Sequence, residues 1–218
     1  MSASFSAERF NALPIVGILR GLDSGRLAPV VDAVIEGGLK NLEITMNTPD
    51  AAAQIRAAVE RSGDRLNVGA GTVTTLERLD EALTAGASFV VTPTVGVPVI
   101  ERCVALGVPV FPGAFSPSEA LRAWELGAMM VKIFPAEVLG PVYIKNLKAP
   151  LPHLKLMPTG GVDLTTLGAY RKAGADGFGV GSPLFRPERL AANDWDWLRQ
   201  QCRAFVEAFA SAAITSPR

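Results

Sequence analysis

The chain has 218 residues, with 21 Lys or Arg and 21 Asp or Glu, so its formal net charge at pH 7 is zero. A nucleic-acid binder needs an excess of basic residues to contact phosphates, and this chain has none. An acidic disordered tail contains few apolar residues, whereas 49% of this chain is hydrophobic. These numbers exclude both classes. The length suits eight strand-and-helix units, which need about 200–250 residues, and we expect residues 1–218 to form a single domain.

No apolar run is long enough for a signal peptide or approaches the roughly 20 residues of a membrane-spanning helix, so we expect neither. The two cysteines, Cys103 and Cys202, lie far apart and outside any CxxC pair. A disulfide framework or a structural zinc site is therefore not expected, and a reducing cytoplasm is the predicted location.

Taken in chain order, eight short apolar runs beside turn signals are predicted to be strands. Their starts are 19 to 26 residues apart, and the segments between them have helical apolar spacing and often stop at a glycine. The runs are Pro14–Leu19, Leu39–Thr45, Arg65–Ala70, Phe89–Pro93, Val108–Gly113, Met129–Phe134, Leu154–Thr159 and Gly177–Val180.

Continuous apolar runs are typical of strands that are buried on both faces, and strand–helix alternation predicts parallel strands with right-handed crossovers. We therefore predict an α/β fold, a single (β/α)8 TIM barrel. An extra helix at about Ala3–Asn11 should precede it, and a final helix at about Trp195–Ala212 should close it. An open doubly wound sheet is the alternative, which the lack of a GxGxxG motif after the first strand disfavours.

Active sites of such barrels lie at the C-terminal ends of the strands, so polar residues in the apolar runs are informative. Lys132 lies inside Met129–Phe134, and strand alternation turns Val131 and Ile133 toward the helices and Lys132 into the barrel. A buried lysine has a lowered pKa, and its neutral amine can form a Schiff base with a ketone. The alternative is a structural lysine paired with a carboxylate across the barrel.

Glu43 interrupts a second apolar run between Leu42 and Ile44, so it should share the interior with Lys132. A carboxylate beside a reactive amine can transfer the protons that Schiff-base chemistry requires. A simple buried salt bridge is the alternative, although such a pair rarely repays its desolvation.

Further candidate binding residues lie at the ends of other predicted strands, and their chemistry is suited to binding a small anion. Arg20 ends the first run as a fixed cation, with surface pairing to Asp23 as its alternative. Thr72, in the small-residue segment Gly69–Val73, offers a hydroxyl and an amide to a carboxylate. The glycine-rich loops after the last two strands predict a phosphate site, through Gly160, Gly161, Gly181 and Ser182.

His153 is the one histidine of the chain, and we expect it in an exposed loop. Catalytic zinc usually draws on at least two His or Cys ligands, and a Ser–His–Asp triad needs a well-placed histidine. No metal and no cofactor are therefore expected.

These residues resemble those of a known family, the bacterial 2-keto-3-deoxy-6-phosphogluconate and 2-keto-3-deoxy-6-phosphogalactonate aldolases. The resemblance runs in family order from about residue 14 to 186. It is carried by Ile18-Leu19-Arg20-Gly21, Leu42-Glu43-Ile44-Thr45, Gly69-Ala70-Gly71-Thr72-Val73, Val91-Thr92-Pro93, Phe111-Pro112-Gly113, Val131-Lys132-Ile133-Phe134-Pro135 and Pro158-Thr159-Gly160-Gly161-Val162.

The resemblance implies a lysine-dependent (class I) aldolase that forms homotrimers and cleaves a phosphorylated keto acid to pyruvate and glyceraldehyde 3-phosphate. It implies that Lys132 forms the Schiff base, that Glu43 is the proton shuttle and that Thr72 holds the pyruvate carboxylate. It also implies a phosphate site and a pocket wall. Arg20, Gly160, Gly161 and Ser182 would hold the phosphate, and Pro93 and Phe134 would line the pocket.

Substrate markers within this resemblance are mixed. Asn47 replaces the arginine typical of phosphogluconate-type members and looks like the phosphogalactonate type, as does the segment Leu139–Lys145. Thr159 instead looks like the phosphogluconate type. We favour the phosphogalactonate substrate and keep phosphogluconate as the alternative.

Two other functions stay open at this point. One is another phosphate-binding TIM-barrel enzyme, an isomerase or synthase, with Glu43 as base and Lys132 as an electrostatic group. The other is a phosphosugar-binding module without turnover, which would be expected to lack Lys132 or Glu43.

Overall fold

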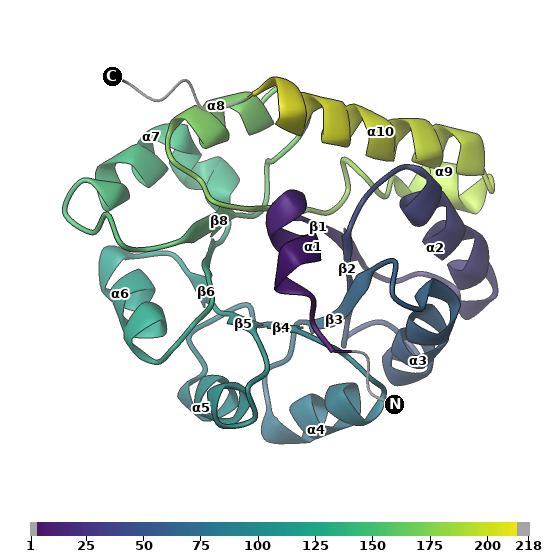
Figure 1. Cartoon of the computed structure of the whole chain (residues 1–218), viewed down its shortest axis with the longest axis horizontal. Coiled ribbons are helices and arrows are strands. Elements are labelled where there is room, and N and C mark those ends of the chain that lie inside the picture. Colours follow the sequence, from purple (N-terminus) through teal and green to yellow (C-terminus); the bar gives the residue numbers. More distant parts are fainter. Residues whose placement is uncertain (1–3, 213–218) are drawn as a thin grey trace.

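The structure, a computed structural model, describes residues 4–212, along which short strands alternate with helices (Figure 1). The strands are β1 (Ile15–Leu19), β2 (Asn41–Thr45), β3 (Asn67–Gly71), β4 (Val90–Val91), β5 (Val110–Phe111), β6 (Gly113–Ala114), β7 (Val131–Ile133), β8 (Leu156–Pro158) and β9 (Phe178–Val180). The helices are α1 (Ala7–Ala12), the 3-10 turn η1 (Ser24–Arg26), α2 (Leu27–Glu36), α3 (Ala51–Ser62), α4 (Leu76–Thr84), α5 (Val97–Ala105), α6 (Pro117–Glu125), α7 (Ala136–Lys148), α8 (Leu167–Lys172), α9 (Pro187–Ala191) and α10 (Trp195–Ser211).

The strand pairs are parallel, as the strand–helix alternation predicted. They form a six-stranded sheet in the order β5-β4-β3-β2-β1-β9 and a three-stranded sheet in the order β6-β7-β8. One parallel bridge, between Thr159 and Gly179, connects β8 to β9. At the other junction, the Met129 amide donates to the Val110 carbonyl at 3.1 Å, and the Lys132 amide donates to the Pro112 carbonyl at 2.8 Å.

Each of the eight predicted runs contains or overlaps a strand, and one run is split in two. The run Val108–Gly113 was expected as a single strand, but it is divided between β5 and β6 at Pro112. Proline has no N–H group and cannot continue the ladder of hydrogen bonds, which explains the interruption.

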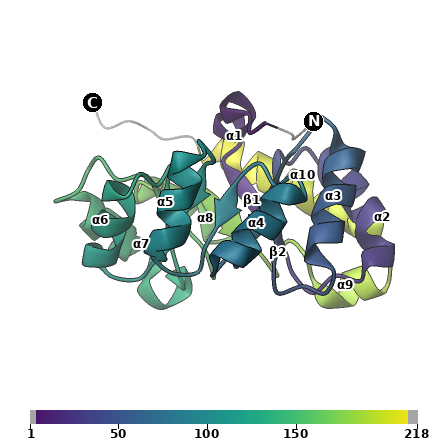
Figure 2. The same ribbon diagram turned by 90° about the horizontal axis from the view of Figure 1, so that it is seen from below.

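Helices surround the strands, and α1 lies across one end of them (Figures 1 and 2). The side chain of Ser6 caps α1 by accepting a 3.1 Å hydrogen bond from the Arg9 amide. The helix was expected at about Ala3–Asn11; its observed span is Ala7–Ala12, and Ala3 lies outside the described residues.

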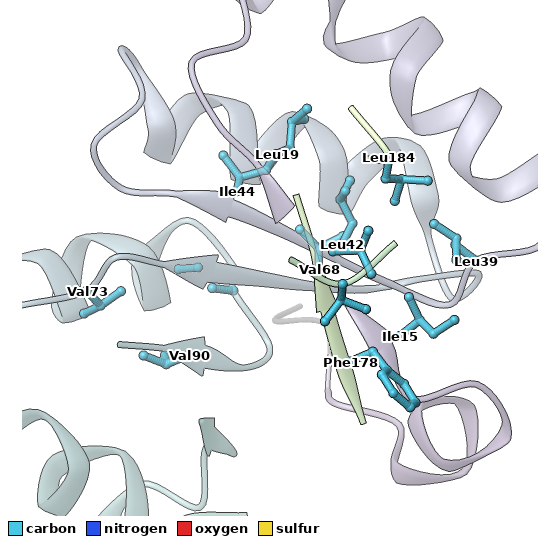
Figure 3. Packing of buried hydrophobic residues seen from close by; sticks show 14 of the residues in the cluster. Ile15, Leu19, Leu39, Leu42, Ile44, Val68, Val73, Val90, Phe178 and Leu184 are labelled. Carbon is cyan, nitrogen blue, oxygen red and sulfur yellow. The ribbon is translucent and has the colours of Figure 1, made fainter. Parts of the chain in front are cut away.

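Alternation along the strands separates two groups of apolar side chains. One group packs between the strands and the helices, and Figure 3 shows Leu42, Ile44 and Val68 among its members. The other group contains Phe10 of α1, whose ring stacks on that of Phe111 at a centroid distance of 5.4 Å. Its buried members are Phe10, Val16, Ile18, Phe89, Val91, Phe111, Met130 and Met157. These side chains form an apolar floor at the α1 end, so the interior is accessible from the opposite end.

Glycines end the predicted helices as expected. The residues Gly38, Gly86, Gly107, Gly127 and Gly174 all have positive φ, the conformation that closes a helix at little cost for glycine. The final helix, expected at about Trp195–Ala212, is α10, and Trp195 and Trp197 pack against the core. Within residues 4–212, no helix is both long and apolar enough to cross a membrane.

Candidate active site

A cavity of about 490 Å³ opens at the C-terminal ends of β1, β7, β8 and β9, opposite the apolar floor. Most of the residues singled out from the sequence meet there, although they come from distant parts of the chain. The predicted residues that line it are Arg20, Lys132, Phe134, Thr159, Gly160, Gly161, Gly181 and Ser182.

Lys132 reaches the cavity from the middle of β7. Its neighbours Val131 and Ile133 pack toward the helices, so the alternation predicted for this strand is confirmed. The side chain is only 6% exposed, and its Nζ lies 4.9 Å from the centroid of the Phe134 ring. Burial lowers the pKa of the Lys132 ammonium; the charge of Glu43 opposes this shift and that of Arg20 adds to it. The site therefore favours the neutral, nucleophilic amine.

Glu43 lies on the interior face of β2 and is 1% exposed. Its backbone pairs in register with Ile18 of β1 and Gly69 of β3. Burial raises the pKa of the Glu43 carboxyl, and the positive charges of Lys132 and then Arg20 partly offset this effect. Its Oε2 is buried and has no hydrogen-bond partner among the described residues. A buried acceptor without a partner is costly, so it marks a place where a ligand or water would complete the bonding.

Lys132 and Glu43 are therefore buried groups of opposite charge whose mutual attraction does not compensate their desolvation. Each pKa shift favours the neutral form, an amine and a carboxylic acid. Such a pair can supply a nucleophile and a proton-transfer group, which is the chemistry that covalent catalysis on a carbonyl requires.

The glycine-rich loops form the other end of the cavity. Gly160 and Gly161 follow β8 and have φ of 86° and 72°, a region that side chains rarely adopt. The loop is fixed from both sides, since the Ala136 amide donates to the Thr159 carbonyl at 2.8 Å and Thr166 Oγ1 donates to the Gly161 carbonyl at 2.9 Å.

Arg20 follows β1 and is exposed at the same end. The proposed alternative, pairing with Asp23, is not observed, because Asp23 Oδ1 instead accepts a 2.9 Å hydrogen bond from the Gly25 amide and caps η1. Arg20, the half-buried glycines of the two loops and the exposed Ser182 all border the cavity and are therefore available to a small anion.

Four predicted site residues do not line this cavity. Glu43 is buried in the interior and is not among the lining residues. Thr72, half-buried, directly follows β3 and has a φ of 56°, which is uncommon for a non-glycine residue. Pro93 is half-buried after β4, and Asn47 is exposed in the loop between β2 and α3. Thr72, Pro93 and Asn47 follow the C-terminal ends of their strands, whereas Glu43 lies at the middle of β2.

Sequence reasoning missed several lining residues, most notably Glu137, which lies in the first turn of α7 beside Gly161. The sequence feature that could have identified Glu137 is its position five residues after Lys132, at the start of the helix that follows the same strand. The remaining missed residues are Ile18, Val162, Gly179, Pro183, Phe185 and Pro187. For residues 4–212, no three His, Cys, Asp or Glu side chains gather as metal ligands would.

Comparison with known proteins gives one consistent family. Residues 7–201 match the family model described as "KDPG and KHG aldolase". The chain is 39% identical over 201 residues to the 2-dehydro-3-deoxy-6-phosphogalactonate aldolase of Escherichia coli, covering 92% of this chain and 96% of that protein.

Solved structures agree. A structure described as native KDPGal is 37% identical, with a TM-score of 0.87 over 96% of this chain and 98% of that one. A KDPG aldolase from Legionella pneumophila, with pyruvate captured as a covalent carbinolamine intermediate, is 26% identical, with a TM-score of 0.84 over 90% of this chain and 96% of that one. A designed cage built by fusing symmetric oligomeric domains is 39% identical, with a TM-score of 0.86 over 92% of this chain and 73% of the cage chain.

Proposed function

The chain belongs to the KDPG and KHG aldolase family, and from this membership we propose that it is a class I aldolase of a 2-keto-3-deoxy-6-phospho-aldonate. The products would be pyruvate and glyceraldehyde 3-phosphate. The observation that carries the proposal is the buried pair of Lys132 and Glu43 beside a cavity with glycine-rich loops at its far end.

Lys132 begins the reaction. Its neutral amine attacks the C2 ketone of the substrate to give a carbinolamine, and loss of water leaves an iminium ion. The lowered pKa of Lys132 supports this role, because an ordinary lysine is protonated at neutral pH and is not nucleophilic. The covalent carbinolamine in the relative from Legionella pneumophila is the same kind of intermediate.

Glu43 transfers the protons. As the carboxylic acid that burial favours, it donates its proton to the carbinolamine hydroxyl, which leaves as water. The resulting carboxylate accepts the proton of the C4 hydroxyl, directly or through a water, while the C3–C4 bond breaks and its electron pair moves to the iminium nitrogen. Glyceraldehyde 3-phosphate leaves, and Glu43 returns the proton to C3 of the enamine. Water then hydrolyses the resulting iminium, releasing pyruvate and the free Lys132 amine.

The remaining residues bind the two anionic ends of the substrate. Thr72 holds the pyruvate carboxylate at the end of β3, with Pro93 and Phe134 lining that part of the pocket. The distal phosphate is bound by one side-chain cation and by loop donors, which fix the reacting end beside Lys132. These phosphate ligands are Arg20, Gly160, Gly161, Gly181 and Ser182, and the support for them is their shared cavity.

The preferred substrate in this proposal is the phosphogalactonate derivative, with the phosphogluconate derivative as the alternative. Asn47 and Thr159 are the residues expected to distinguish the two substrates. The relative at 39% identity, a phosphogalactonate aldolase, supports this preference. The two substrates differ in configuration at C4, so a coupled assay of pyruvate release from each epimer measures the preference directly.

Trapping with borohydride tests the function. In the presence of pyruvate, borohydride should reduce the iminium to a stable secondary amine, and peptide mass should place the adduct on Lys132. An isomerase or synthase would form no such adduct and would release no pyruvate. A binding module would bind the substrate without turnover. Absence of the adduct, under conditions that trap a known aldolase, would contradict the proposal.

We also propose that the two sheets are parts of one closed (β/α)8 barrel preceded by an extra N-terminal helix, in a single domain over residues 1–218. The bridge between Thr159 and Gly179 and the hydrogen bonds at Met129 and Lys132 support closure, because they connect the sheets at both junctions. Loss of all secondary structure in one cooperative thermal transition is the expected signature of a single domain.

A homotrimer is the assembly we propose. Its support is an exposed apolar surface near the start of α7, where Val138 and Val142 are 69% and 67% exposed. The exposed Phe115 belongs to the same region, since the Tyr143 hydroxyl of α7 donates to the Phe115 carbonyl at 2.8 Å. Light scattering should give three times the chain mass, and Val142→Asp should dissociate the trimer. A monomeric wild-type protein would contradict this assembly.

Cytoplasmic location is likewise a proposal. Its support is that Cys103 and Cys202 are both buried and unpaired, as expected in a reducing compartment. Fractionation of cells that express the protein tests it.

A further inference from the structure

The loop that carries Arg20 is attached to the neighbouring loop after β2 through the side chain of Thr48. The Gly21 amide donates a 2.9 Å hydrogen bond to Thr48 Oγ1, and Thr48 Oγ1 lies 3.1 Å from Thr45 Oγ1. Thr48 is 5% exposed, so water does not readily replace this bond. The Thr48 hydroxyl therefore fixes the backbone at the residue immediately after Arg20.

A second buried side chain joins the same two loops. Gln54, in α3, donates from Nε2 to the Leu22 carbonyl at 2.9 Å and to the Pro49 carbonyl at 3.1 Å. Gln54 is 1% exposed, and its Oε1 has no hydrogen-bond partner among the described residues. The loops after β1 and β2 are thus held together at two successive residues, Gly21 and Leu22, even though a buried acceptor stays unsatisfied.

The Arg20 side chain has no such attachment. In the part of the chain that the structure describes, its guanidinium forms neither a hydrogen bond nor an ion pair, and it is exposed at the rim of the cavity that Gly161 and Ser182 also line. Its position therefore depends on the backbone from which it extends. That backbone turns at Gly21, where φ is 65° and Thr48 accepts the amide hydrogen bond.

We propose that Thr48 is a positioning residue, whose hydroxyl holds the Arg20–Gly21 turn so that the Arg20 guanidinium meets the distal phosphate of the substrate. The inference rests on the proposed aldolase function and adds to it a residue outside the cavity that acts only on the phosphate end. Pyruvate itself carries no phosphate, so its reaction with Lys132 is independent of this interaction. The two ends of the substrate can therefore be measured separately.

Two substitutions isolate the hydroxyl. Thr48→Val has nearly the same shape but removes the acceptor, whereas Thr48→Ser keeps it. Because one hydrogen bond typically changes an equilibrium by about threefold to tenfold, we expect Thr48→Val to raise the KM for the phosphorylated substrate by that factor. The rate of borohydride trapping with pyruvate should be unchanged, and Thr48→Ser should behave like the wild type. Thr48→Ala, with less bulk, is the second variant if Thr48→Val does not fold.

A double-mutant cycle shows whether Thr48 acts through Arg20. Arg20→Ala should raise the same KM, and adding Thr48→Val to Arg20→Ala should have little further effect, because the side chain that Thr48 positions is gone. Additive effects, an unchanged KM in Thr48→Val, or an equal loss of pyruvate trapping would each overturn the inference. Failure of the proposed function would look different, since the wild type itself would then form no adduct with pyruvate.

Discussion

Gly71 lies directly against the Glu43 carboxyl: a Cβ atom at Gly71 would be 1.6 Å from Glu43 Oε1 and 2.3 Å from Cδ. Both distances are far shorter than any real Cβ contact. The Glu43 carboxyl therefore occupies the space that a side chain at position 71 would need. The φ of Gly71 is not positive, so its backbone conformation does not require glycine. Glycine is required at this position only because a larger residue would collide with Glu43. The role of Glu43 therefore depends on a residue of the neighbouring strand.

Gly71→Ala should displace Glu43 and strongly reduce cleavage. Removal of a positioned acid–base group typically lowers the rate by about 10²–10⁴-fold, so we expect kcat to fall by at least about 10²-fold. Exchange of the C3 protons of pyruvate with deuterium, followed by NMR, should fall in parallel, because Glu43 transfers that proton. Gly96→Ala is the matched control, since a Cβ there meets nothing within 4 Å and Gly96 has a negative φ of −82°. Full exchange activity in Gly71→Ala would contradict this reading of the contact.

Glu43→Gln should be inactive yet more stable than the wild type at neutral pH. Burial raises the pKa of Glu43 above its ordinary value of 4.5, so the folded state binds the proton more tightly than the unfolded state. Folding stability therefore falls as the pH rises from about 4.5 through the raised pKa, and the neutral amide avoids this loss. The thermal midpoint should rise at pH 7 by about 2–4 °C for each kcal/mol recovered, and the difference should vanish below pH 4.5. A lower midpoint at pH 7 would instead show that the charged carboxylate stabilises the fold.

The sequence predicted the strands and the central pair because both signals are local. A charged residue at an alternating position of an apolar run must face the interior, and this rule placed both Lys132 and Glu43. The break at Pro112 was also visible in the sequence, but its effect on the ladder was not anticipated. By contrast, Gly71 contacts Glu43 of the neighbouring strand, and Thr48 bonds to Gly21 of the neighbouring loop. Such contacts between distant segments leave no periodic pattern in the sequence.

The rim of the site was predicted less completely than its centre. Parallel strands bring all their C-terminal ends to one side, which was enough to group Arg20 with Gly161 and Ser182. Whether a side chain at such an end lines the cavity depends on the conformation of its loop, and Asn47 and Thr72 do not line it. Loop conformation is set by hydrogen bonds such as the one between Gly21 and Thr48, which sequence spacing does not reveal.

Lys132→Met should abolish cleavage and leave the fold intact. Methionine has a similar length and no charge to desolvate, so the variant should unfold at the same temperature as the wild type or a higher one at pH 7. Burial lowers the pKa of Lys132, which costs folding stability below the ordinary lysine pKa of 10.5 and costs less as the pH rises toward that value. Thermal unfolding at pH 7 and pH 10 checks the sign, and a coupled pyruvate assay checks the activity. An unfolded variant would indicate a structural lysine.

Glu137→Gln should strengthen binding of the phosphorylated substrate. Glu137 is exposed at the rim of the cavity, and its Oε2 lies 3.4 Å from the position that a Cβ of Gly161 would occupy. Its carboxylate is thus beside the loop that we propose as a phosphate site, and two negative charges at such a distance repel each other. We expect the KM to fall by about twofold to fivefold at low ionic strength, with a smaller change at 0.5 M salt, where ions screen the repulsion.

Glu60→Gln, on the exposed surface of α3, is the control for a generic loss of negative charge. A higher KM in Glu137→Gln would mean that the carboxylate accepts a hydrogen bond from a substrate hydroxyl, a role that would outweigh its repulsion of the phosphate.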